Sequence, residues 1–144
     1  MKHFPFIAVI FSLLLFSCKT ADDEIKFTFL QINDVYEIGE LGGTGGMDRV
    51  ETLHKKLLAE NENTLMFLAG DFLNPSLLST IKVDGERLKG KHIIEVMNAM
   101  NFDLVCLGNH EFDVGEEALQ QRINESNFQW ITTNARHKIN AAKI

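Results

Sequence analysis

The stretch 104-LVCLGNHEFD-113 decides the fold, because a short apolar run ends there in a cluster of polar side chains. Two earlier stretches repeat this arrangement, 27-FTFLQIND-34 and 64-TLMFLAGD-71. Each apolar run has the length of a strand. The first run is rich in aromatic and β-branched residues, and the run from 64 to 69 is nearly continuous. Each run stops at Gly, Asn or Asp. We therefore predict three strands whose C-terminal ends carry polar side chains.

Helical periodicity fills the gaps between these strands. Apolar residues recur at helical spacing over 47–58, 93–100 and 119–123, and 128–133 reads as a fourth strand. The order β-α-β-α-β-α-β predicts an α/β fold with parallel neighbouring strands, as an incomplete sheet of a layered architecture. The continuous apolar run 64–69 predicts a strand buried on both faces.

Composition excludes several classes of protein. The chain has 144 residues, which is the length of one domain, and a formal net charge of −6. Without a basic surplus, binding to a nucleic-acid duplex through its phosphates is excluded. Cys18 and Cys106 are the two cysteines, too few for a disulfide scaffold or a four-cysteine zinc site.

The first 17 residues resemble a secretory signal peptide. Their uncharged stretch runs from Phe4 to Phe16 and is too short to cross a bilayer as a helix; a buried core helix is the alternative. Leu15 to Cys18 resembles a bacterial lipobox, in which Cys18 would be lipidated. We expect a polar tether at 18–25 and export to the cell envelope or periplasm, with a lipid anchor to the membrane.

The polar strand ends predict a site. Ligands in open α/β sheets bind at the carboxyl ends of the strands, so Asp34, Asp71, Asn109 and His110 should gather at one edge. Hard oxygen ligands with a nearby histidine suit divalent cations. A single Asp after a strand is more simply a helix N-cap, but three such ends in register favour a site.

The motifs QINDVYEI (31–38), AGDFLNPS (69–76) and GNHEFD (108–113) resemble those of calcineurin-like metallophosphoesterases, in the 5′-nucleotidase branch. The resemblance spans roughly residues 26 to 134. It implies two divalent metal ions (Mn, Zn, Mg or Fe) and hydrolysis of nucleotides or other phosphate esters. By the same resemblance Asp34 binds the first metal, Asp71 bridges both, and Asn109 binds the second. His110 then stabilises charge on the leaving oxygen.

The chain departs from the family pattern in two ways. Tyr36 stands where the family has a histidine, and it is either a substitute ligand or a packing residue, with Glu37 as another substitute. Further metal-binding histidines of the family lie on later strands, so we expect 26–144 to be the N-terminal part of a metallophosphoesterase domain. Phe72 and Phe112 follow the proposed ligands and are expected to wall the site.

Two glycine-containing stretches are similar to nucleotide-binding motifs but do not complete them. Gly43-x-Gly45 lacks the third glycine of a dinucleotide-binding fingerprint, and the near P-loop 85-GERLKGKH-92 ends in His92 instead of Ser or Thr. A different class of function is a non-catalytic lipoprotein remnant or binding module that retains the sheet but has lost the chemistry.

Overall fold

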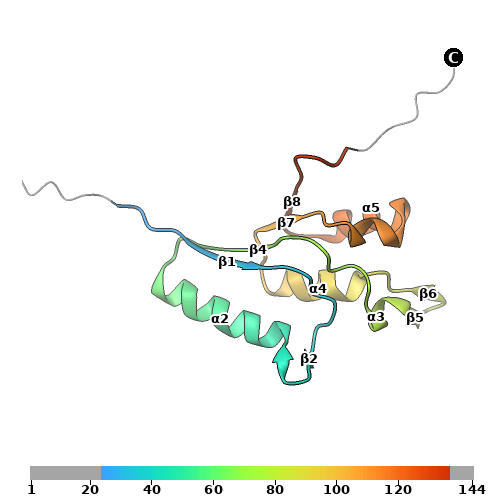
Figure 1. The fold of residues 1–144 in the computed structure, drawn as a ribbon, viewed down its shortest axis with the longest axis horizontal. Coiled ribbons are helices and arrows are strands. Elements are labelled where there is room, and N and C mark those ends of the chain that lie inside the picture. Colours follow the sequence, from blue (N-terminus) through green and yellow to red (C-terminus); the bar gives the residue numbers. More distant parts are fainter. Residues whose placement is uncertain (1–23, 137–144) are drawn as a thin grey trace, which may run out of the picture.

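The computed structural model describes residues 24–136. The predicted signal peptide (1–17) and Cys18 lie outside the described residues. Four parallel strands form the central sheet in the order β1-β4-β7-β8 (Figure 1). They are β1 (Thr28–Ile32), β4 (Thr64–Leu68), β7 (Leu104–Cys106) and β8 (Gln129–Ile131). The predicted α/β fold with a parallel sheet is confirmed.

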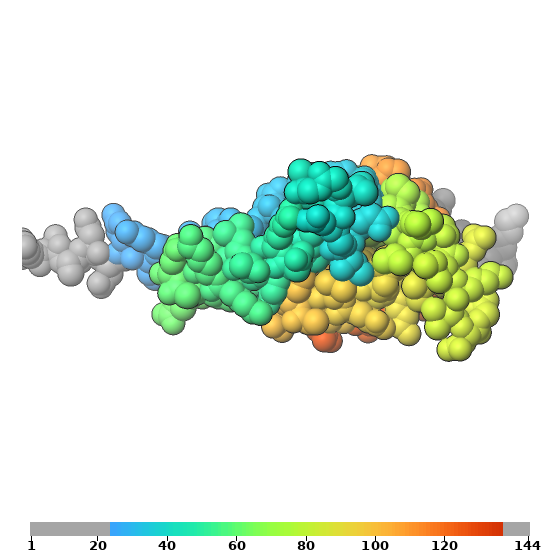
Figure 2. All heavy atoms as spheres, turned by 90° about the horizontal axis from the view of Figure 1, so that it is seen from below, coloured from blue at the N-terminus to red at the C-terminus, as the bar shows by residue number. Residues whose placement is uncertain are grey.

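Three helices connect the strands, as their periodicity predicts. They are α2 (Met47–Glu60), α4 (Lys91–Ala99) and α5 (Glu116–Glu125). Figures 1 and 2 show α2 and α4 on the same side of the sheet, next to each other. Among residues 24–136, no helix is both long and apolar enough to span a bilayer.

The end of α2 fixes how the helix leads into the sheet. Asn61 has extended backbone, which ends the helix, and its side-chain Nδ2 donates to the Lys26 carbonyl at 3.1 Å and to Thr28 Oγ1 at 3.1 Å. Thr64 Oγ1 donates to the Asn61 carbonyl at 2.7 Å. One asparagine therefore stops α2 and ties its end to the first residues of β1 and β4.

The core lies on one face of the sheet. Alternate residues of the strands point to this face and pack against apolar side chains of α2, α4 and α5. The strand residues include Leu30, Ile32, Met66, Leu68, Val105 and Trp130, and the helix residues include Met47, Ile93, Ile94, Met97 and Leu119. Leu65 and Phe67 of β4, which point to the other face, are only half-buried. The prediction of a strand buried on both faces is wrong for the described residues, because their helices pack on a single face.

Two short hairpins and a short helix were not predicted. The glycine-rich segment forms a hairpin of β2 (Glu40–Leu41) and β3 (Thr44–Gly45), whose two turn residues, Gly42 and Gly43, both have positive φ (61° and 85°). This is the backbone that a tight two-residue hairpin requires. A short helix, α3 (Leu77–Thr80), and a second hairpin, β5 (Lys82–Val83) with β6 (Glu86–Arg87), lie between β4 and α4.

Candidate active site at the carboxyl edge of the sheet

The loops after β1 and β4 are joined by their backbones. Ile32 pairs with Leu68 in register, so both strands end at the same level. Beyond the strands, the Asp34 N–H donates to the Gly70 carbonyl at 3.1 Å, and the Ala69 N–H donates to the Ile32 carbonyl at 2.8 Å. The two loops therefore leave the sheet side by side, which places Asp34 and Asp71 on neighbouring loops.

Both aspartates adopt an unusual backbone conformation. Asp34 has φ 55° and Asp71 has φ 63°, in the left-handed region that asparagine and aspartate tolerate better than most residues. Strained backbone of this kind concentrates at functional sites. It turns the chain sharply at the end of each strand, as the predicted site requires.

The loop after β7 reaches Asp71 through a hydrogen bond. The backbone N–H of His110 donates to Asp71 Oδ1 at 2.9 Å. The other carboxylate oxygen of Asp71 has no hydrogen-bond partner among residues 24–136 and is available to a ligand. Asn109, the residue before His110, is exposed at the start of the 3-10 helix η2 (His110–Val114).

The buried side chain of Glu111 joins the loop after β4 to the loop after β7. Its side chain is 0% exposed, and its Oε2 accepts hydrogen bonds from the backbone N–H groups of Asp71 (2.8 Å) and Gly108 (2.6 Å). Its Oε1 accepts from Phe72 (2.7 Å) and Leu73 (3.2 Å). A buried carboxylate with four N–H donors is fully satisfied, so Glu111 fixes the backbone on which Asp71 and His110 sit.

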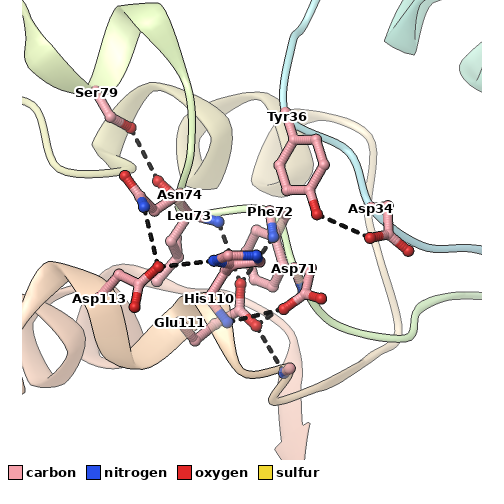
Figure 3. A network of polar contacts seen from close by, with 11 residues as sticks. Asp34, Tyr36, Asp71, Phe72, Leu73, Asn74, Ser79, His110, Glu111 and Asp113 are labelled. Carbon is pink, nitrogen blue, oxygen red and sulfur yellow. Dashed lines mark hydrogen bonds and ion pairs between the residues drawn. The ribbon is translucent and has the colours of Figure 1, made fainter.

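His110 is paired with a second carboxylate (Figure 3). Its Nδ1 lies 2.7 Å from Asp113 Oδ2, one turn further along η2, and Asn74 Nδ2 donates to the same oxygen at 3.2 Å. The hydrogen bond with Asp113 raises the pKa of His110, and the bonds from His110 and Asn74 lower the pKa of Asp113. The contact with Asp113 occupies Nδ1, which leaves Nε2 as the ring nitrogen that can face a substrate.

Asp34 is held by two neighbours. Tyr36 donates its hydroxyl to Asp34 Oδ1 at 2.8 Å, and Asn33 Nδ2 donates to Asp34 Oδ2 at 2.5 Å. These bonds, that of Asn33 first, lower the pKa of Asp34, while the bond to Asp34 raises the pKa of Tyr36 to about 12. Glu37 is engaged elsewhere, since its Oε1 accepts from the Leu77 N–H at 3.2 Å.

The structure thus places Asp34, Asp71, Asn109 and His110 on three loops at one edge of the sheet. Among residues 24–136, no group of three or more His, Cys, Asp or Glu side chains is close enough to hold a metal ion by itself. The oxygen donors match the chemistry of a divalent cation, and the free Asp71 oxygen is open to one.

Sequence reasoning missed the residues that support the site. Glu111, Asp113, Asn74 and Asn33 were not assigned roles, although the spacing from His110 to Asp113 is one helical turn and could have indicated a pair. Phe72 does not wall the site: it is 1% exposed and packs in the core, with its ring centroid 5.5 Å from that of Trp130. Phe112 is exposed.

Comparison with known proteins agrees with this geometry. The model of the calcineurin-like phosphoesterase family matches residues 27–141, and the chain belongs to this family. It is 32% identical to a probable 5′-nucleotidase of Treponema pallidum over 137 residues, which is 84% of this chain and 22% of that protein. The chain therefore spans about a fifth of the length of this curated relative.

Solved structures show the same fold. The NAD nucleotidase of Haemophilus influenzae has a TM-score of 0.63 and 30% identity, over 75% of this chain and 23% of that one. A calcineurin-like phosphoesterase of Bacillus subtilis has a TM-score of 0.57 and 27% identity, over 73% of this chain and 36% of that one. Both support a phosphoesterase type of hydrolase.

Proposed function

We propose that this chain carries part of the active site of a metal-dependent phosphoric ester hydrolase that acts on nucleotides. The observation that carries the proposal is the link between two strand ends: the His110 N–H donates to Asp71 Oδ1, and Glu111 accepts from the backbone N–H groups of Asp71 and Gly108. This link joins the backbone of His110 to Asp71, the residue that we propose as a shared metal ligand. Nucleotides as the substrate class rest on the nucleotidases among the relatives.

Asp34, Asp71 and Asn109 would hold two divalent ions, with Asp71 shared between them. Bound there, such ions would neutralise charge on the phosphoryl group and supply an activated water. His110 would face the leaving-group oxygen through Nε2, because Nδ1 is held by Asp113. The raised pKa of His110 favours its protonated form, which stabilises negative charge as the ester bond breaks.

The test is an assay of the full-length protein with AMP and with a generic aryl phosphate, with and without Mn²⁺. We expect metal-dependent release of phosphate. Asp71→Asn should lose both metal binding and activity, whereas His110→Ala should bind metal and lose on the order of 10²–10⁴ in kcat. Gly39→Ala, on an open position after β1, is a matched control that should retain activity.

The alternative function is a binding module without chemistry. Metal and nucleotide binding by the wild-type protein without any turnover would favour that alternative and contradict the hydrolase proposal.

We also propose that the protein is exported and anchored through a lipid on Cys18, on the basis of its first 18 residues. One acyl chain gives only marginal membrane binding, so a stable anchor needs more than one. Labelling of cells with a radioactive fatty acid should mark the wild-type protein and not Cys18→Ala. Label retained in the variant would contradict the anchor.

A further inference from the structure

Tyr36 lies between two side chains of the candidate active site. It follows Asp34 by two residues on the loop after β1 and is half-buried. Figure 3 shows its hydroxyl directed to Asp34, at 2.8 Å from Oδ1, with Asp71 and His110 nearby. It is the single tyrosine of the chain.

The Tyr36 hydroxyl helps to fix the orientation of the Asp34 carboxylate. Both oxygens of Asp34 receive a hydrogen bond, Oδ1 from Tyr36 and Oδ2 from Asn33, so the orientation of the carboxylate is fixed by two donors. A phenol that donates its proton to a carboxylate is a neutral donor. Tyrosine binds a cation most strongly as the phenolate, which has no proton to donate to Asp34.

The ring of Tyr36 makes a second contact. It meets the His110 imidazole edge-on, with ring centroids 6.1 Å apart and an interplanar angle of 86°. This geometry is favourable for aromatic pairs. Tyr36 therefore touches the acidic residue after β1 with its hydroxyl and the histidine after β7 with its ring.

We propose that Tyr36 is a positioning residue, which orients the Asp34 carboxylate by hydrogen bonding and supports the His110 ring, and that it supplies no metal ligand. The proposal rests on the proposed metal site for the role of Asp34, but the contact itself is independent of any metal. Groups that orient a ligand in this way change metal affinity about 10- to 100-fold when they are removed.

The hydrogen bond can be tested without metal. The intensity ratio of the tyrosine doublet in the Raman spectrum reports whether a phenol hydroxyl donates to a strong acceptor, and a single tyrosine makes the signal unambiguous. We expect a strong-donor ratio in the metal-free wild-type chain and a shift toward the solvent-exposed ratio in Asp34→Ala. Identical spectra for the two proteins would overturn the proposal.

The positioning role is tested by Mn²⁺ titration calorimetry of the wild type and Tyr36→Phe, which keeps the ring and removes the hydroxyl. We expect about tenfold weaker binding in Tyr36→Phe and no tyrosinate absorption when Mn²⁺ is added to the wild type. Phe27→Leu, at an exposed aromatic just before β1, should bind as the wild type does. Equal affinity in Tyr36→Phe, or tyrosinate absorption on metal addition, would overturn the proposal.

These readouts separate the two proposals. If the wild type binds no metal, the proposed metal site fails, while the Raman comparison still decides whether Tyr36 holds Asp34.

Discussion

Gly70 and Gly108 sit where the loops after β4 and β7 pass each other at van der Waals distance. A Cβ built on Gly108 would lie 2.2 Å from Asp71 Oδ1 and 2.6 Å from the Asp71 backbone nitrogen. Gly108 has no positive φ, unlike Gly70 (φ 89°). The absence of a side chain at Gly108 is therefore a matter of space and not of backbone freedom.

We predict that Gly108→Ala displaces the Asp71 carboxylate and destabilises the protein by about 2 kcal/mol, as expected for overpacking at a rigid contact. Denaturant unfolding measures the stability, and Mn²⁺ titration measures whether the proposed metal site is weakened. Gly39→Ala is the matched control, because nothing lies within 4 Å of its added Cβ. Equal stability of the two variants would contradict the close contact.

The pair of His110 and Asp113 makes stability depend on pH in a defined direction. Because the folded pKa of His110 is raised, its contribution is complete below the ordinary histidine pKa and is lost as pH rises through the raised value. Because the folded pKa of Asp113 is lowered, its contribution is lost as pH falls through that lowered value. The contribution of the pair is therefore complete between the ordinary pKa of aspartate and the ordinary pKa of histidine.

We predict that Asp113→Asn lowers the pKa of His110, since the carboxylate that favours the imidazolium is removed. NMR titration of the His110 ring in both proteins measures this change. Both side chains are well exposed, so we expect little effect on stability. An unchanged His110 pKa in Asp113→Asn would show that the contact does not control the protonation of the ring.

The sequence patterns predicted which strand ends carry the candidate site, but not the hydrogen bonds that hold the loops after these strands together. Asp34, Asp71 and His110 follow recognisable apolar runs, and their position is a consequence of parallel strands ending at one edge. The role of Glu111 depends on two loops whose backbone N–H groups converge on one point. No local spacing encodes that convergence, because its partners lie 38 to 40 residues away, apart from Gly108.

At the level of the elements, a buried arginine of α5 forms hydrogen bonds with the segment that follows β6. Arg122 is 5% exposed, and its guanidinium donates to the carbonyls of Leu88 (2.7 Å) and Lys89 (3.3 Å), which follow β6. It also donates to Glu125 Oε1 at 2.9 Å. Arg122 thus joins α5 to the hairpin segment through charge-assisted hydrogen bonds.

We predict that Arg122→Met lowers the free energy of unfolding by about 2 kcal/mol, because the carbonyls of Leu88 and Lys89 lose a charged donor while the aliphatic bulk is retained. Thermal or urea unfolding measures this loss. Arg87→Met, an exposed arginine on β6, is the matched control and should change stability by less than about 0.5 kcal/mol. A similar small change in Arg122→Met would contradict the fastening role.

Long periodic elements were predictable and short ones were not. The apolar stripe of α2 and the runs of β1 and β4 repeat enough times to fix element type and approximate bounds. The hairpin of β2 and β3 has two residues per strand and depends on Arg49, which donates to the carbonyls of Gly43 (2.9 Å) and Gly45 (3.3 Å) and pairs with Glu40. These side-chain contacts leave no repeating pattern in the sequence, which indicates only a flexible glycine-rich loop.

In the part of the molecule that the structure describes, helices cover one face of the sheet and leave the other face open. The helices cover the face of Met66 and Leu68, whereas Phe29 (62% exposed) and Ile131 (44% exposed) lie on strands β1 and β8 with their side chains accessible. Phe29 stacks between neighbouring rings, 6.4 Å from Phe27 and 5.6 Å from Phe67. Exposed apolar side chains on one face of a sheet favour binding of apolar molecules and association.

We predict that the open face binds the dye ANS and that the double variant Phe29→Thr, Ile131→Thr reduces its fluorescence. Threonine keeps a high strand propensity, and both side chains are accessible, so stability should change by less than about 1 kcal/mol. Leu77→Thr, an exposed leucine on α3, is the control that should leave ANS fluorescence unchanged. If the double variant bound ANS as the wild type does, the dye would bind elsewhere. The open face of the sheet would then not be the apolar binding surface.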